Sequence, residues 1–237
     1  MGSPTEAGAS PTRDDLERRL NAFLTWWLGT WPPSESLVVS GSPERTRPGW
    51  DGQVRPVLGL ATPMGTVVSV PMAIEKSADD LASSGFEALN DAIGALVGRP
   101  GAKLVRGVFR WSERVVDLPE AGEWVLRTDS RIPPWLRPFN GDVLVAFDHD
   151  RYAAGVGLKR HSPLGIEIAV GTEEHHRGKG LASRLVAQAS RRILAEGAIA
   201  LYLHARDNVA SAHVAERAGF PDDGWEIIEL WQGSSRP

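Results

Sequence analysis

The chain has 237 residues, of which 42% are hydrophobic, and its formal net charge at pH 7 is -4. That length and apolar content suffice for one large or two smaller cores, while a net negative charge offers no electrostatic footprint for nucleic acid. The absence of cysteine excludes disulfides, thiolate catalysis and cysteine-based zinc sites.

No apolar run approaches the roughly 18 residues of a membrane span, and the N-terminus lacks the apolar segment of a signal peptide. We therefore expect a cytoplasmic protein without a membrane partner. Arginine greatly outnumbers lysine, and alanine, glycine and proline are abundant, a composition typical of a bacterium with GC-rich DNA.

The N-terminal half alternates between helical and strand patterns. Residues 1–13 are rich in Gly, Ser, Pro and Thr, which predicts a mobile tail. An amphipathic helix follows, with Asp14 and Asp15 as caps and apolar side chains at helical spacing up to Trp27. A second helix is expected over 78–97, with Ser77 before it as a cap. Strands are expected at 36–39, 54–61, 66–70, 104–111 and 124–127.

The C-terminal half begins with a hairpin of two strands, 143–147 and 152–158, joined by a polar turn at 148–150. The apolar alternation of 166–170 predicts a further strand, which leads through a polar turn into a helix that opens near Gly178 and ends near Gly197. A strand at 200–204, a helix from Asn208 to the pair Gly219-Phe220, and a strand at 225–231 complete the chain.

Gly178 and Gly180 stand where the first helical N–H groups lack intrahelical partners, beside the positive charges of Arg177 and Lys179. Such a helix N-terminus binds phosphate, because its dipole favours anions and glycine lets the anion approach the main chain. An ordinary glycine-rich turn is the simpler interpretation of so short a segment.

Two nucleotide-binding patterns fit this loop poorly. A Walker A loop is excluded, because Gly171 lies too far before Gly178 and Gly180 occupies the position of its Ser or Thr. A dinucleotide fingerprint requires glycine or alanine at position 183, which is Ser183, and further strand-helix-strand units.

The third pattern, R-x-x-G-x-A, is filled by Arg177, Gly180 and Ala182, and it resembles the coenzyme A pyrophosphate loop of the GNAT superfamily of N-acetyltransferases. The later segment also resembles that family, because Asn208 opens a helix that stops at Gly219-Phe220. The resemblance covers roughly the C-terminal half and is clearest from Gly141 to Trp231. It implies an α/β (α+β) fold with a mixed, mostly antiparallel central sheet flanked by helices.

Two domain arrangements are compatible with this resemblance, because residues 141 onward begin too late to supply a whole GNAT fold. A separate, smaller α+β domain at 14–120 would precede an acetyltransferase domain at 121–237, or N-terminal elements would complete a single sheet. We favour the first, since the N-terminal half has enough elements for its own core. We expect it to shape substrate access or to mediate homodimerisation.

The resemblance also implies a binding site for acetyl-CoA. One strand would pair with the pantetheine arm, the glycine loop would hold the pyrophosphate, and the segment after the next strand would contact the arm. The implied coenzyme-binding residues are Ile168, Ala169, Val170, Arg177, Gly178, Lys179, Gly180, Leu181, Ala182, Ser183, Asn208 and Ser211.

Two residues are candidates for the general base that deprotonates the substrate ammonium. His204 ends a strand close to where family members often carry a glutamate, and Glu167 lies on the strand face opposite to Ile166 and Ile168. A structural histidine and a salt-bridged glutamate are the simpler alternatives. The run 173–176 of two glutamates and two histidines is interpreted as a solvated turn rather than a metal site.

One position departs from the family pattern. Many family members have a tyrosine that protonates the leaving thiolate, and Ala215 occupies its position here. Three alternatives follow: the thiolate leaves without that acid, another group such as His213, Tyr202 or Ser211 replaces it, or the protein binds coenzyme A without efficient turnover. The sequence therefore predicts an acetyl-CoA-dependent N-acetyltransferase that acts on a primary amine by direct attack. A catalytically weak CoA-binding regulatory or interaction module is the alternative, and a nucleotide-binding oxidoreductase ranks third.

Overall fold

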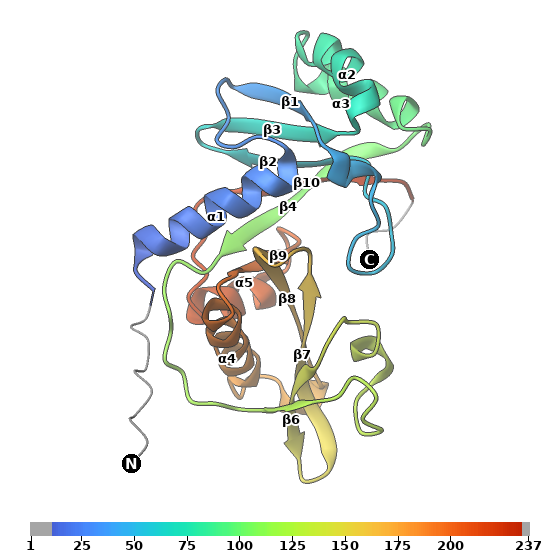
Figure 1. The fold of residues 1–237 in the computed structure, drawn as a ribbon. Coiled ribbons are helices and arrows are strands. Elements are labelled where there is room, and N and C mark those ends of the chain that lie inside the picture. Colours follow the sequence, from blue (N-terminus) through green and yellow to red (C-terminus); the bar gives the residue numbers. More distant parts are fainter. Residues whose placement is uncertain (1–10, 234–237) are drawn as a thin grey trace, which may run out of the picture.

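The computed structural model describes residues 11–233, which form a ten-stranded mixed sheet with helices on both faces (Figure 1). The helices are α1 (Arg13–Leu28), α2 (Glu75–Ala82), α3 (Phe86–Leu96), α4 (Leu181–Ala195) and α5 (Val209–Arg217). The strands are β1 (Leu37–Gly41), β2 (Leu58–Thr62), β3 (Gly65–Val70), β4 (Lys103–Trp111), β5 (Glu123–Val125), β6 (Val143–Asp148), β7 (Arg151–Arg160), β8 (Gly165–Thr172), β9 (Ile199–His204) and β10 (Glu226–Trp231).

The strand order across the sheet is β1-β3-β2-β10-β4-β9-β8-β7-β6-β5. Pairing is parallel between β1 and β3 and between β8 and β9, and antiparallel between all other neighbours. The fold class expected from the sequence, a mostly antiparallel sheet flanked by helices, is confirmed.

Helix α1 lies across one face of the sheet, and it begins one residue before the predicted start. Thr12 is its N-cap, and it exchanges hydrogen bonds with Asp15 in a capping box. The prediction that Asp15 helps to cap the helix is therefore confirmed, whereas Asp14 is not the N-cap. Nearly all of the predicted tail, residues 1–10, lies outside the described residues. The apolar stripe of α1 packs on β9, because Leu20, Phe23 and Leu24 share a buried cluster with alternate β9 side chains.

The single helix predicted over 78–97 is wrong, because the chain forms two helices there. Gly85, between α2 and α3, has φ of 103°, a left-handed conformation that no continuous right-handed helix contains. Helix α2 also starts at Glu75 without a side-chain cap, so Ser77 lies inside the helix. Both helices cover the β1 end of the sheet (Figure 1).

Helix α4 covers the other face of the sheet from α1. Leu185, Val186 and Ile193 of α4 pack with Ala200 and Tyr202 of β9. The alternate β9 residues Ile199, Leu201 and Leu203 pack instead in the cluster of α1. Period-two alternation along β9 thus separates two cores on opposite faces of one sheet.

The sheet is continuous across the domain boundary expected at residue 120. Strand β10, near the C-terminus, lies between β2 and β4 of the N-terminal half, and β4 pairs with β9 through residues 108–111. Folding of 14–120 as a domain on its own stays a prediction.

Within residues 11–233, none of the helices combines the length and the apolar character that a membrane span requires.

Candidate functional site

The strands β8 and β9 run side by side for only a short distance. Residues 165–167 of β8 pair with residues 199–201 of β9, and from Ile168 onward β8 pairs only with β7. The end of β9 pairs instead with β4, up to the pair of His204 with Val108. The two strands therefore separate inside the sheet, and a cavity lies on each face at this point.

The cavity on the α4 face has a volume of about 630 Å³. Its wall is formed by the end of β8, the N-terminal turn of α4, Tyr202 of β9, and helix α5. Gly178 and Gly180 both have φ of 74°, and a Cβ built at either position would meet only open space. Gly180 is the N-cap of α4 and carries no side chain to cap it, so the first N–H groups of the helix are left for a ligand.

Most of the coenzyme-binding residues expected from the sequence line this cavity. They are Val170, Arg177, Gly178, Gly180, Leu181, Ala182, Ser183, Asn208 and Ser211. Three do not line it: Ile168 is buried in the core under α4, Ala169 packs against the cluster of Leu136 and Phe139, and Lys179 lies outside the lining. Residues that the sequence analysis did not assign to the coenzyme also line it: Gly171, Thr172, His176, Tyr202, Ala210, His213, Val214 and Arg217.

Helix α5 begins at the N-cap Asn208 and contains Ala215, the position that departs from the family pattern. Asn208 caps α5, because its side-chain oxygen accepts a hydrogen bond from the Ser211 N–H at 3.0 Å. Ala215 is fully buried in the core. Tyr202 lines the same cavity, and burial raises the pKa of its phenol against the lowering effect of a hydrogen bond with Ser211. The phenol therefore keeps its proton at neutral pH.

The cavity on the α1 face has a volume of about 260 Å³ and is lined by both halves of the chain. Its lining combines aromatic with ionisable side chains. The lining residues are Trp27, Trp50, Arg55, Val105, Arg106, Gly107, Lys159, His161, Glu167, Leu203, His204, Ala205, Ile227, Glu229 and Trp231. Leu203 lies here and Tyr202 lies in the other cavity, so consecutive β9 residues place one side chain on each face.

Glu167 is the central charge of this second cavity, with 6% of the residue exposed. Its carboxylate forms an ion pair with Lys159 and accepts a hydrogen bond from His161 Nε2 at 3.0 Å. Burial raises the pKa of Glu167, but the two partners outweigh it and hold the pKa at about 2. Glu167 is therefore ionised at neutral pH. The pKa of Glu229 is raised, first by burial and then by the charge of Glu167.

His161 was not singled out in the sequence, yet it is held in one orientation. Because an ionised carboxylate only accepts, Nε2 of His161 carries the proton toward Glu167, and in the neutral ring Nδ1 keeps its lone pair. No hydrogen bond within residues 11–233 engages Nδ1. The ring lies against Trp27, with ring centroids 5.1 Å apart.

His204 lines the same cavity, but both of its ring nitrogens are engaged. Arg110 Nε donates to His204 Nε2 at 3.1 Å, and His204 Nδ1 lies 2.8 Å from the carbonyl oxygen of Ala205. Arg110 is itself buried and forms ion pairs with Glu216 and Asp222. The lone pair on His204 Nε2 therefore already accepts a hydrogen bond from Arg110.

The run 173–176 contains a short 3-10 helix, Glu174–His176, and only His176 of these four residues lines the coenzyme-side cavity. His176 Nε2 lies 3.8 Å from an oxygen of Asp148. Among the described residues, no group of three or more His, Asp or Glu side chains converges as a metal site would require.

Residues 108–220 match the family model described as the acetyltransferase (GNAT) family. A search of curated proteins finds no match to the chain. Similar solved structures include a protein described as a GNAT acetyltransferase from Novosphingobium aromaticivorans, with 19% identity over 57% of this chain and 70% of that chain and a TM-score of 0.47.

A GNAT acetyltransferase from Colwellia psychrerythraea has 11% identity over 68% of this chain and 74% of its own, with a TM-score of 0.47. A GCN5-related N-acetyltransferase-like protein from Streptococcus suis has 20% identity over 70% and 71%, with a TM-score of 0.45. The match to the family model covers residues 108–220, slightly less than half of the chain.

The ion pairs of Glu167 predict a specific pH dependence of stability. Its pKa is about 2 in the folded chain against 4.5 as the reference value, so ionised Glu167 stabilises the fold fully above about pH 4.5. That contribution is lost as the pH falls toward 2. Glu167→Gln should lower the free energy of unfolding by a few kcal/mol at pH 6, since one unit of pKa is about 1.4 kcal/mol. Urea denaturation should show this difference shrinking between pH 4.5 and pH 2; a difference independent of pH would contradict the ion-pair assignment.

Proposed function

Because residues 108–220 match the model of the GNAT acetyltransferase family, we propose that this protein transfers an acetyl group from acetyl-CoA to a primary amine by direct attack in a ternary complex. The observation that carries the proposal is the pair of cavities on opposite faces of the sheet where β8 and β9 separate. A coenzyme bound on one face and an amine bound on the other would meet between the strands.

The α4-face cavity suits coenzyme A in size and in chemistry. Its pyrophosphate would accept hydrogen bonds from the N–H groups of residues 181–183, with Arg177 adding positive charge. The edge of β8 from Ile168 to Val170 has no strand partner on the β9 side, so its main chain can bind an extended arm. Ile168 and Ala169 would then contribute through their backbones, while their side chains pack in the cores. When bound, acetyl-CoA supplies an acetyl thioester.

The α1-face cavity would hold the amine, and we assign its deprotonation to His161. The imidazole presents Nδ1 as the proton acceptor, and Glu167, ionised and bonded to Nε2, orients the ring and stabilises the imidazolium that forms. Glu167 is in this account a positioning residue. Its own pKa of about 2 makes it a weak base toward an ammonium. The engaged nitrogens of His204 favour a structural role for that residue.

A catalytically weak CoA-binding module remains the second candidate function, because Ala215 provides no acid for the leaving thiolate. Tyr202 supports turnover instead, since its protonated phenol lies in the coenzyme cavity beside Ser211. Residues 14–120 supply Trp27, Trp50 and Arg55 to the amine cavity, which supports a role in shaping substrate access. Homodimerisation stays a prediction.

Coenzyme binding is tested by Gly180→Glu, which places a carboxylate in the pyrophosphate site. The control is Gly197→Glu at the other end of α4, where φ is 86° and a Cβ likewise meets only open space, so the backbone strain is matched. By calorimetry, Gly180→Glu should weaken CoA binding at least 100-fold and the control by less than 3-fold. Equal affinities of Gly180→Glu and wild type would rule out this loop as the pyrophosphate site.

The role of His161 is tested by the pH profile of acetyl transfer to an amine panel. In His161→Gln, kcat should fall by about 10²- to 10⁴-fold and the rise of kcat/KM with pH should disappear, because the proton acceptor is lost. CoA affinity should not change. His149→Gln, with a side chain 96% exposed on the β6-β7 turn, is the matched control. If His204→Gln rather than His161→Gln abolished the pH dependence, the assignment would be wrong.

A further inference from the structure

A buried guanidinium lies beside the amine cavity and has no carboxylate partner. Arg45, in the short helix Pro43–Thr46, is 3% exposed. Its Nη2 donates to the Trp27 carbonyl at 3.0 Å, and its Nη1 lies 3.4 Å from the Arg55 carbonyl. Its Nε is buried without a hydrogen-bond partner. No ion pair joins Arg45 to an acidic residue of the described chain, 11–233.

The neighbouring arginines are neutralised and Arg45 is not. Arg47 forms an ion pair with Glu44, and Arg55 makes a two-pronged ion pair with Asp51. Burial lowers the pKa of Arg45 to about 10 against the attraction of Glu44, so the side chain keeps its charge at neutral pH. A buried charge without an ion-pair partner destabilises the fold, and an anionic ligand would offset that cost.

Arg45 lines a small second cavity of about 50 Å³ that adjoins the amine cavity. Trp27, Arg55 and His161 line both cavities. The small cavity has room for a group such as a carboxylate and none for a nucleotide. Arg47 and its ion-pair partner Glu44 line it too, whereas Asp51, the partner of Arg55, does not.

We propose that the small cavity is an anion subsite and that the acceptor is an amino acid whose carboxylate binds at Arg45 while its amine lies at His161. This inference deepens the proposed function and rests on it. Each cation of the amine cavity pairs with a carboxylate, Lys159 with Glu167, Arg55 with Asp51 and Arg106 with Glu226, and Glu229 adds a further negative charge there. The positive charge of Arg45, which has no such partner within residues 11–233, lies in the small cavity. A zwitterion matches this separation of charge, and a simple alkylamine matches only half of it.

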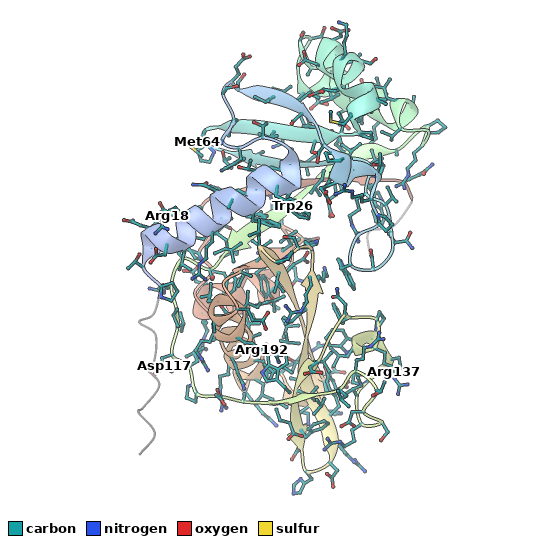
Figure 2. The ribbon with its side chains drawn as sticks, in the orientation of Figure 1. Arg18, Trp26, Met64, Asp117, Arg137 and Arg192 are labelled. Atoms are coloured by element: carbon teal, nitrogen blue, oxygen red, sulfur yellow. The ribbon has the colours of Figure 1, made fainter. Side chains whose placement is uncertain are left out.

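A purely structural role for Arg45 is the competing explanation. Its donor bond to Trp27, in the last turn of α1, satisfies a helix C-terminal carbonyl and ties α1 to the 43–55 segment. The test must therefore separate loss of the fold from loss of anion recognition. Arg45→Lys keeps the charge, and Arg45→Gln removes it. Arg18→Gln removes an exposed arginine from the outer face of α1 and is the control (Figure 2).

The first experiment measures binding without the coenzyme. Trp26 and Trp27 line the small cavity, and Trp26 is seen on α1 in Figure 2, so tryptophan fluorescence reports its occupancy. The probes are glycine, β-alanine, 4-aminobutyrate and 6-aminohexanoate, each against the alkylamine of equal length. At least one amino acid should give a saturable change that its alkylamine does not. The change should vanish in Arg45→Gln and persist in Arg45→Lys and Arg18→Gln.

The second experiment measures acetylation of the same pairs. In the wild type, kcat/KM should favour the best amino acid over its alkylamine at least 10-fold, and Arg45→Gln should reduce that ratio below 3-fold while the alkylamine rate is retained. Binding without any acetyl transfer would refute the proposed function and leave the anion subsite standing. No saturable binding of any amino acid, or a loss of both substrates' rates in equal proportion in folded Arg45→Gln, would overturn the subsite.

Discussion

The separation of β8 and β9 after the pair of Glu167 with Leu201 is the constraint on which the site depends. Each strand has a partner on its far side, β7 for β8 and β4 for β9, so both stay extended while the edges that face each other lose their ladder. Unpaired strand edges inside a sheet leave main-chain donors and acceptors for a ligand. The same separation places one cavity on each face of the sheet at a single point.

The two faces receive different chemistry because strand side chains alternate. Tyr202 lies in the α4-face cavity and Leu203 in the α1-face cavity, so β9 contributes to both. The α4 face is polar through a helix N-terminus and its main chain, which suits a phosphate-bearing coenzyme. The α1 face is polar through fixed ionised side chains, which suits proton transfer. The N-terminal half contributes lining residues to the α1-face cavity and none to the α4-face cavity. Strand β10 pairs with β2 and β4 and so joins the two halves of the chain in one sheet.

Local patterns in the sequence predicted most helices and strands, but they could not predict which strands that lie far apart in the chain pair with each other. Alternation and glycine placement located the hairpin β6-β7, the strand β8 and the glycine loop before α4, because each signal lies within a few residues. The break between α2 and α3 was missed, because the left-handed conformation of Gly85 leaves no mark on the helical spacing of the apolar residues. The position of β10 between β2 and β4 joins residues more than a hundred apart, which no local pattern encodes.

The coenzyme loop could be predicted because its residues lie close together in the sequence. The amine cavity could be predicted only in part. Lys159 pairs directly with Glu167 across the β7-β8 hairpin, so the register could have identified this ion pair and the nearby His161. The burial of Arg45 could not be predicted, because it depends on packing between α1 and the 43–55 segment.

The structure of the protein with coenzyme A bound tests the account most directly. We expect the pyrophosphate at the N-terminus of α4 and the thiol between β8 and β9, within hydrogen-bond reach of the Tyr202 hydroxyl and open toward His161. A thiol directed to solvent, away from the point where β8 and β9 separate, would contradict the account.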